Sequence, residues 1–231
     1  MAWWSKWIES LPPKIEPQRP APIEPMAEVA AEPSVKAKGA ITLAAVVGSA
    51  VAIALGVAIP QEESGRKVEA SIGDQGQLVV RHISGKQYLK AYLDVVGVAT
   101  ACDGITTYRG KPITKDMSFT EEQCAAMLEE ELVKHAQGMM ACTPGLALSA
   151  DPAEEKRREG PRFSAASVTY NIGIGRYCSS TARVRFNAGD FAGGCTALTW
   201  WNKAGGVVNK GLVNRRAREA KVCREGLGAL T

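Results

Sequence analysis

A long uncharged run near the N-terminus is the most distinctive feature of the hydrophobic pattern. Residues 39–60 form 22 consecutive positions without a charged side chain, and about 20 apolar residues suffice for a helix that spans a bilayer. Two lysines shortly precede the run and two glutamates follow it. The positive-inside rule then keeps the N-terminus in the cytoplasm and exports the rest. We predict a transmembrane or signal-anchor helix here, with a cleaved signal peptide as the rival interpretation.

Small residues make this run only weakly apolar. Gly, Ala, Ser and Thr supply 12 of its 22 positions, and Gly48, Ala52 and Gly56 recur at four-residue spacing. Such a ladder permits close helix–helix packing within a membrane. A marginally apolar helix can also leave the bilayer, as signal-anchor-release segments do. A permanent anchor and a released one therefore both stay open.

The periodicity of the remaining chain predicts helices and one small sheet. Ser118-Phe119-Thr120-Glu121 has the pattern of a capping box that opens a helix ending near His135. Three further helices are expected, over residues 164–172, 190–202 and 212–227. β-formers alternate with glycines over residues 92–107, which is typical of a hairpin. The expected fold class is α+β, mostly helical, with a single transmembrane helix before the domain.

Composition divides the chain into four parts. Seven of the 12 prolines lie in residues 1–38, which predicts an extended cytoplasmic tail. The predicted span over 39–60, a linker over 61–77 and a main domain over 78–227 follow. The net charge of +4 is too small to indicate nucleic-acid binding, and we expect a monomer without a cofactor. Three arginines are expected on a solvated helix face: Arg215, Arg216 and Arg218.

All six cysteines lie at or beyond Cys102, on the side of the span that is predicted to be exported. An oxidising compartment favours disulfides, although the sequence allows several connectivities. Cys195 and Cys223 are the preferred pair because they lie on adjacent predicted helices. Elimination then leaves two further pairs, Cys142 with Cys178 and Cys102 with Cys124. No cysteine or histidine spacing indicates a zinc site, so no metal is expected.

A carboxylate and a hydroxyl flank the turn of the predicted hairpin. Asp94 and Thr100 lie six positions apart, so a hairpin can bring them to one cleft. There Asp94 would activate or position a water molecule that Thr100 holds. The alternative is structural, because an Asp before a turn commonly caps it.

Several ordered motifs resemble the phage-type lysozymes of glycoside hydrolase family 24. AYLDVVGVATACDG, residues 91–104, resembles their active-site hairpin. Further matching motifs follow in order at residues 119–124, 170–175, 189–191, 200–206 and 210–219. The resemblance covers about residues 78–227 and implies a lysozyme-like fold. It also implies a peptidoglycan hydrolase that cleaves the β-1,4 bond between N-acetylmuramic acid and N-acetylglucosamine and lyses bacteria. Its expected place is the periplasmic side of the inner membrane, anchored through residues 39–60 or released.

The resemblance also implies a catalytic set of a Glu, an Asp and a Thr at fixed spacing. Asp94 and Thr100 match their positions, with five residues between them. The position of the acid falls on Gly85, or on Ser84 if one residue is inserted. Neither residue can donate a proton to a glycosidic oxygen, which is what the reaction requires of the acid.

Two interpretations of the missing acid stay open. In the first, another group supplies the proton, and Asp103 is the candidate because it lies on the same hairpin and would face Asp94 across the cleft. His82, expected on a helix, is a poorer candidate. In the second, the chain is a catalytically impaired peptidoglycan-binding protein derived from a lysozyme.

Overall fold

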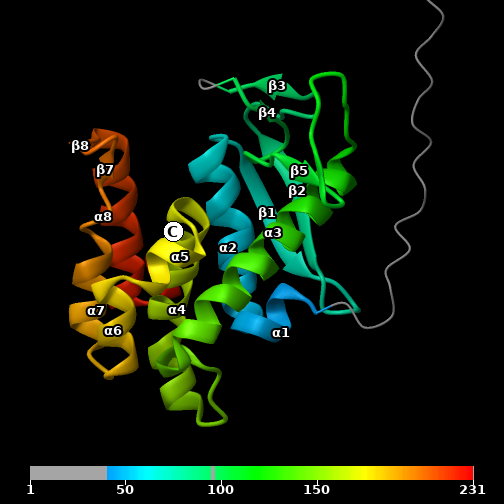
Figure 1. The fold of residues 1–231 in the computed structure, drawn as a ribbon. Coiled ribbons are helices and arrows are strands. Elements are labelled where there is room, and N and C mark those ends of the chain that lie inside the picture. Colours follow the sequence, from blue (N-terminus) through cyan, green and yellow to red (C-terminus); the bar gives the residue numbers. More distant parts are fainter. Residues whose placement is uncertain (1–40, 95–96, 231) are drawn as a thin grey trace, which may run out of the picture. The chain divides into compact units, whose positions relative to one another are not determined.

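The computed structural model describes residues 41–94 and 97–230. Its helices are α1 (Leu43–Val47), α2 (Ser49–Glu63), α3 (Glu121–Cys142), η1 (Pro144–Leu146), α4 (Pro152–Ile172), α5 (Ile174–Cys178), α6 (Thr181–Asn187), α7 (Phe191–Leu198), α8 (Lys210–Glu225) and η2 (Leu227–Leu230). Its antiparallel hairpins are β1–β2 (Lys67–Ile72, Leu78–Ser84), β3–β4 (Tyr92–Leu93, Ala99–Thr100), β5–β6 (Thr107–Tyr108, Lys111–Pro112) and β7–β8 (Lys203–Ala204, Val207–Val208). Figure 1 shows the helices gathered around α4, with β1–β6 together on one side, so the fold is α+β and mostly helical. The predicted tail over residues 1–38 lies outside the described residues.

The uncharged run is folded as two helices rather than one span. Gly48 separates α1 from α2, and its φ of 86° lies in the left-handed region that glycine adopts without a side-chain clash. Within residues 41–94 and 97–230, none of the helices is long and apolar enough to cross a membrane. The single transmembrane helix predicted over residues 39–60 is therefore not an element of this structure. The compact unit begins at Ile41, well before the predicted domain start at residue 78.

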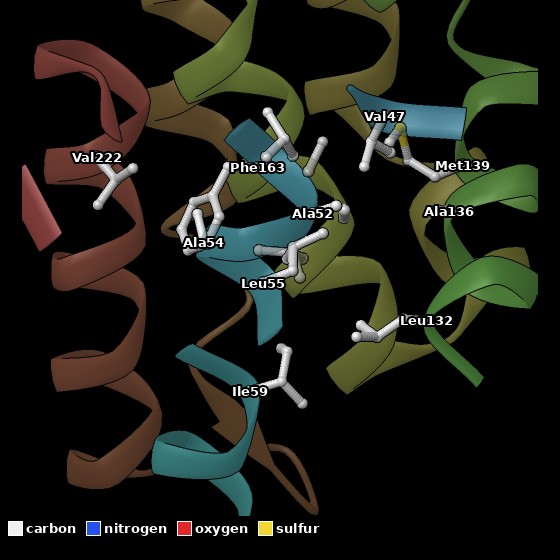
Figure 2. Packing of buried hydrophobic residues seen from close by; sticks show 14 of the residues in the cluster. Val47, Ala52, Ala54, Leu55, Ile59, Leu132, Ala136, Met139, Phe163 and Val222 are labelled. Atoms are coloured by element: carbon white, nitrogen blue, oxygen red, sulfur yellow. The ribbon is translucent and has the colours of Figure 1, made fainter. Parts of the chain in front are cut away.

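Helix α2 lies in the main hydrophobic core. Figure 2 shows Leu55 and Ile59 of α2 in one cluster with Leu132 of α3, Phe163 of α4 and Val222 of α8. All five side chains are buried. A helix that is apolar on every side can be surrounded by protein as well as by lipid. The apolar pattern alone therefore does not distinguish these two environments.

The small residues of the predicted ladder permit close packing inside the domain. A Cβ atom on Gly56 would lie 2.9 Å from Leu78 Cδ1 and 3.1 Å from Ala70 Cβ. Glycine at this position thus lets the β1–β2 hairpin approach α2 closely. The ladder was expected to permit packing between membrane helices. In the folded domain Gly56 instead permits packing of α2 against the β1–β2 hairpin.

Residues 61–77, predicted to be a linker, complete α2 and form strand β1 and the turn that leads to β2. The buried side chains of this hairpin, Val68, Leu78 and Val80, pack in the same cluster as α2. In both strands they alternate with more exposed neighbours, as expected for a hairpin with one buried face. His82, expected on a helix, lies in β2.

The predicted capping box is present two residues further along the chain. The Thr120 side chain accepts a hydrogen bond from the Gln123 backbone, and the Gln123 side chain accepts one from the Thr120 backbone. The pair is therefore Thr120 with Gln123 rather than Ser118 with Glu121, and α3 continues beyond His135. Local spacing predicted the type of cap correctly, and its register incorrectly.

The three predicted disulfides are confirmed: Cys102–Cys124, Cys142–Cys178 and Cys195–Cys223. The first joins the β3–β4 region to the start of α3. It belongs to a second, smaller core that includes Ala101, Ile105 and Phe119. A crosslink of this kind stabilises the fold mainly by restricting the unfolded chain. The hairpin that carries Asp94 is thus covalently fastened to the helical part.

Arg162 is a fully buried cation that ties α1 to α4. Its guanidinium donates hydrogen bonds to the carbonyl oxygens of Val47, Leu146 and Ala147 and to the carboxylate of Glu155. These bonds from Arg162 hold the pKa of Glu155 below its ordinary value. The pair therefore stabilises the folded state only while Glu155 is ionised.

This ion pair predicts a pH dependence of stability. Because the folded-state pKa of Glu155 lies below the unfolded value of about 4.3, its stabilisation is complete above that value and is lost as the pH falls through the folded one. We expect Glu155→Gln to reduce the difference between the unfolding free energies measured in urea at pH 7 and pH 3. Glu154→Gln, which alters an exposed ion pair on the same helix, is the matched control. An equal reduction in both variants would contradict this assignment.

Candidate active site

Hairpin β3–β4 places Asp94 at its turn and Thr100 in strand β4. Tyr92 pairs with Thr100 in the ladder. Just beyond, the Asp94 N–H donates to the Val98 carbonyl at 2.9 Å, and Asp94 Oδ1 accepts from the Val98 N–H at 2.8 Å. Thr100 is buried, and its Oγ1 donates to the Val98 carbonyl at 3.1 Å. Asp94 thus fixes the turn, as its structural alternative requires, while its catalytic role stays a prediction.

Asp103 lies in a buried ion pair. Its carboxylate accepts hydrogen bonds from Arg66 Nε at 2.8 Å and Arg66 Nη2 at 2.7 Å, and a third from Ser64 Oγ at 3.0 Å. The side chain has no exposed surface. The Arg66 guanidinium binds both carboxylate oxygens in the bidentate manner typical of structural ion pairs. These surroundings suit a structural role at the base of the hairpin.

The sequence position expected for the acid has no room for a side chain. Gly85 has a φ of 95°, and a Cβ atom there would lie 2.8 Å from the Arg66 Cα atom. The neighbouring Ser84 is the exposed last residue of β2. A carboxyl group introduced at Gly85 would therefore displace the backbone rather than restore a site.

A carboxylate from the end of α2 reaches the hairpin region instead. Glu63 is the last residue of α2, and its side chain is 22% exposed. Its Oε1 accepts a hydrogen bond from Arg215 Nη1 at 2.7 Å. Its Oε2 lies 3.8 Å from the ideal Cβ position of Gly104. Glu63 is thus held between α8 and the segment that follows β4.

Two tyrosines lie near these carboxylates. The pKa of Tyr92 is raised first by burial and then by neighbours that include Asp94 and Glu63. The pKa of Tyr170 is raised first by burial and then by Glu63 and Asp103. The Tyr170 hydroxyl also donates to the Asp103 carbonyl oxygen at 3.3 Å, which ties α4 to the hairpin region. Tyr170 thus lies near the end of α2 and near the segment that carries Asp103.

Two of the three arginines expected on a solvated face are buried. Arg215 is 5% exposed and Arg216 is 1% exposed. Arg215 bonds to Glu63, and both arginines contact the buried carboxylate of Glu219. The pKa of Arg215 lies above its ordinary value, because the attraction of Glu63 and Glu219 outweighs the opposing effect of burial. Neutralising partners from α2 and α8 explain why the prediction was wrong for these two residues.

The Glu62–Arg218 ion pair lies beside the Glu63–Arg215 ion pair. Arg218 donates to both carboxylate oxygens of Glu62, at 2.8 and 2.7 Å, from the exposed side of α8. The two adjacent glutamates that end α2 therefore each hold one arginine of α8. Both pairs hold the end of α2 against α8, and each orients its own carboxylate.

Sequence reasoning missed Glu63 because it counted a fixed spacing back from Asp94. In the structure the β1–β2 hairpin lies between the end of α2 and Ser84, so Glu63 and Asp94 are 31 positions apart. The available signal was the pair of glutamates at the end of the uncharged run. Among the described residues, no three His, Cys, Asp or Glu side chains are grouped so that they could hold a metal ion.

Known proteins match this chain over the region just described. The sequence profile of the family described as phage lysozyme matches residues 84–219. A SAR-endolysin of Bacteriophage PS119 is 36% identical over 144 residues, which cover 62% of this chain and 78% of that protein.

Two solved structures are similar as well. An endolysin from Escherichia coli O157:H7 phage FAHEc1 has a TM-score of 0.50 at 31% identity, covering 60% of this chain and 84% of that one. A mutant of P22 lysozyme has a TM-score of 0.51 at 21% identity, covering 72% and 93%, and supports the fold alone. The matched family profile begins after α1, α2 and β1.

Proposed function

The chain belongs to the phage lysozyme family and is a glycoside hydrolase of that family, and we propose that it cleaves the β-1,4 bond between N-acetylmuramic acid and N-acetylglucosamine in peptidoglycan. Relatives named as endolysins support bacterial lysis as the outcome. The observation that carries the proposal is the position of Glu63, whose carboxylate lies against Gly104 beside the hairpin of Asp94 and Thr100.

Glu63 is the general acid in this proposal. Glycoside hydrolysis needs one carboxyl group that protonates the leaving oxygen and a second carboxylate that acts from the other side of the sugar. The Glu63 side chain is partly exposed and oriented by Arg215, so a substrate can reach it. Asp103 is enclosed and bound to Arg66, which leaves it no route to a glycosidic oxygen. The acid thus comes from the end of α2 rather than from the position before Asp94 or from Asp103.

Asp94 acts opposite the acid, with Thr100 beside it. The carboxylate of Asp94 is held by the Val98 N–H at the turn, which fixes its direction. The Thr100 hydroxyl donates its hydrogen bond to the Val98 carbonyl. The lone pairs of Oγ1 can therefore accept a hydrogen bond from a water molecule. In this arrangement Asp94 takes a proton from that water or attacks the anomeric carbon directly.

Residues 39–60 serve in this proposal first as a membrane anchor and afterwards as α1 and α2. The uncharged, weakly apolar run and the relatives named SAR-endolysin support this order of events. The domain would then stand on the periplasmic side of the inner membrane, and the segment would leave the bilayer to complete the core. Because Glu63 ends α2, the acid would reach its position only after this step.

The test is release of new reducing ends from peptidoglycan. Purified full-length chain should generate them, whereas a protein that binds sacculi without generating them would support the impaired-binder alternative. A fragment that starts at residue 62 is an unsuitable sample because it lacks α1 and most of α2, which lie in the main core. The impaired-binder alternative was based on the lack of an acid at Gly85 or Ser84. In the proposal Glu63, at the end of α2, takes the role of that acid.

A further inference from the structure

Behind Arg215 lies a carboxylate that the proposed reaction does not use. The Glu219 side chain is 4% exposed. Its Oε1 accepts hydrogen bonds from Ser167 Oγ at 2.6 Å, Arg215 Nε at 3.2 Å and Arg216 Nη2 at 3.0 Å. Its Oε2 lies 2.6 Å from Arg216 Nε. Removing a carboxylate from water costs free energy, and the hydrogen bonds and ion pairs of these partners compensate for that cost.

Glu219 and Glu63 bind opposite parts of one guanidinium. Arg215 bonds to Glu219 through Nε and to Glu63 through Nη1. The guanidinium is planar and rigid, so fixing its Nε side also fixes the direction of Nη1. Ser167 on α4 in turn fixes the Glu219 carboxylate. A chain of contacts therefore runs from α4 through α8 to the acid at the end of α2.

The same group balances charge around the acid. Arg215 and Arg216 place two cations behind Glu63, and the Glu219 carboxylate offsets one of them. Burial raises the pKa of Glu219, while both arginines and Ser167 act in the opposite direction by stabilising the ionised form. Other charged groups nearby are Glu62 on α2, Lys67 on β1 and Arg218 on α8, which line a cavity of about 350 Å³ together with Glu219. On the side of the acid, Tyr170 of α4 and Asp103 are the further titratable groups.

We propose that Glu219 is a positioning residue that orients Arg215 against Glu63 and, through its charge, sets the pH range in which Glu63 works as the acid. This inference rests on the proposed function, since it requires Glu63 to act on the substrate. Glu219 itself is enclosed and does not touch the substrate. Its effect is therefore expected in kcat and in the pH profile, with KM unchanged.

Two charge changes of opposite sign test the inference in the purified full-length chain. Glu219→Gln leaves the two arginine charges uncompensated, which favours the ionised form of the acid. The alkaline limb of the kcat/KM profile should move to lower pH by about one unit. Arg216→Gln removes one cation, and the limb should move to higher pH by a similar amount. The double variant restores the charge balance, and its limb should coincide with that of the wild type.

Matched controls separate charge from damage to the fold. Glu225→Gln makes the same chemical change at an exposed site on α8 and should leave the profile unchanged. Ser167→Ala and Ser164→Ala remove buried hydroxyls one turn apart on α4. The first donates to the Glu219 carboxylate and the second to the Glu219 backbone carbonyl. Ser167→Ala should lower kcat several-fold, because the hydrogen bond that orients the Glu219 carboxylate is lost. Ser164→Ala should leave kcat unchanged.

The outcomes distinguish this inference from the proposed function. Opposite shifts in the two single variants, with the double variant near the wild type, support it. An unchanged profile in folded Glu219→Gln, or shifts in the same direction, would overturn it while leaving the hydrolase intact. If the charge variants do not fold, equal kcat values in Ser167→Ala and Ser164→Ala would overturn it. Full activity in Glu63→Gln would instead refute the proposed acid.

Discussion

Glu63→Gln should abolish nearly all hydrolysis of peptidoglycan while the protein stays folded. A general acid typically contributes a factor of about 10²–10⁴ to the rate, and the amide cannot supply the proton. The amide oxygen can still accept the 2.7 Å hydrogen bond from Arg215 Nη1, so the contact that holds the end of α2 is preserved in part. We expect a loss of about 10³-fold in kcat, measured as reducing ends released per enzyme, and little change in binding to sacculi.

The neighbouring glutamate provides the matched control for this variant. Glu62 occupies the same helix end and forms an equivalent ion pair, with Arg218 rather than Arg215. Glu62→Gln should therefore show a similar change in the urea unfolding free energy and a kcat within about twofold of the wild type, because it removes a surface pair and no proton donor. Comparable activity losses in both variants would mean that the ion pairs matter only for docking α2. Glu63 would then lose its role as the acid.

Asp94→Asn should give the second large loss, about 10²–10³-fold in kcat. In the proposed mechanism its carboxylate acts opposite the acid, and an amide neither accepts a proton from water nor attacks the anomeric carbon. Asn keeps an oxygen that can accept the Val98 N–H, so the turn geometry is retained. The unfolding free energy is expected to change by about 1 kcal/mol or less, the scale of a local cap.

Asp74→Asn is the control because Asp74 is an exposed turn residue of a different hairpin, β1–β2. It should leave kcat unchanged. If folded Asp94→Asn retained wild-type turnover, Asp94 would be a turn residue alone.

The stereochemistry of the first product, followed by NMR of the anomeric proton, separates an inverting from a retaining reaction in the wild type.

Several features of this protein could be predicted from the sequence because they depend on neighbours along the chain. Alternating β-formers and glycines predicted the hairpin of Asp94 and Thr100, and apolar periodicity predicted α3 and α8. The disulfide between Cys195 and Cys223 followed from the adjacency of two predicted helices. The exact register of the α3 cap did not follow, because Ser118 and Thr120 both stand three residues before a side chain that can complete a box.

Packing decided the two points on which function depends. Burial of apolar surface is non-directional, so the run from Ile41 to Pro60 satisfies a bilayer and a protein core alike. Only the contacts of Leu55 and Ile59 with the surrounding helices show which environment the folded chain provides. The second point is the identity of the carboxyl group that we propose as the acid. Glu63 and Gly104 are 41 positions apart. They meet because α2 packs against α4 and the β1–β2 hairpin and forms ion pairs with α8, and no local spacing encodes these long-range contacts.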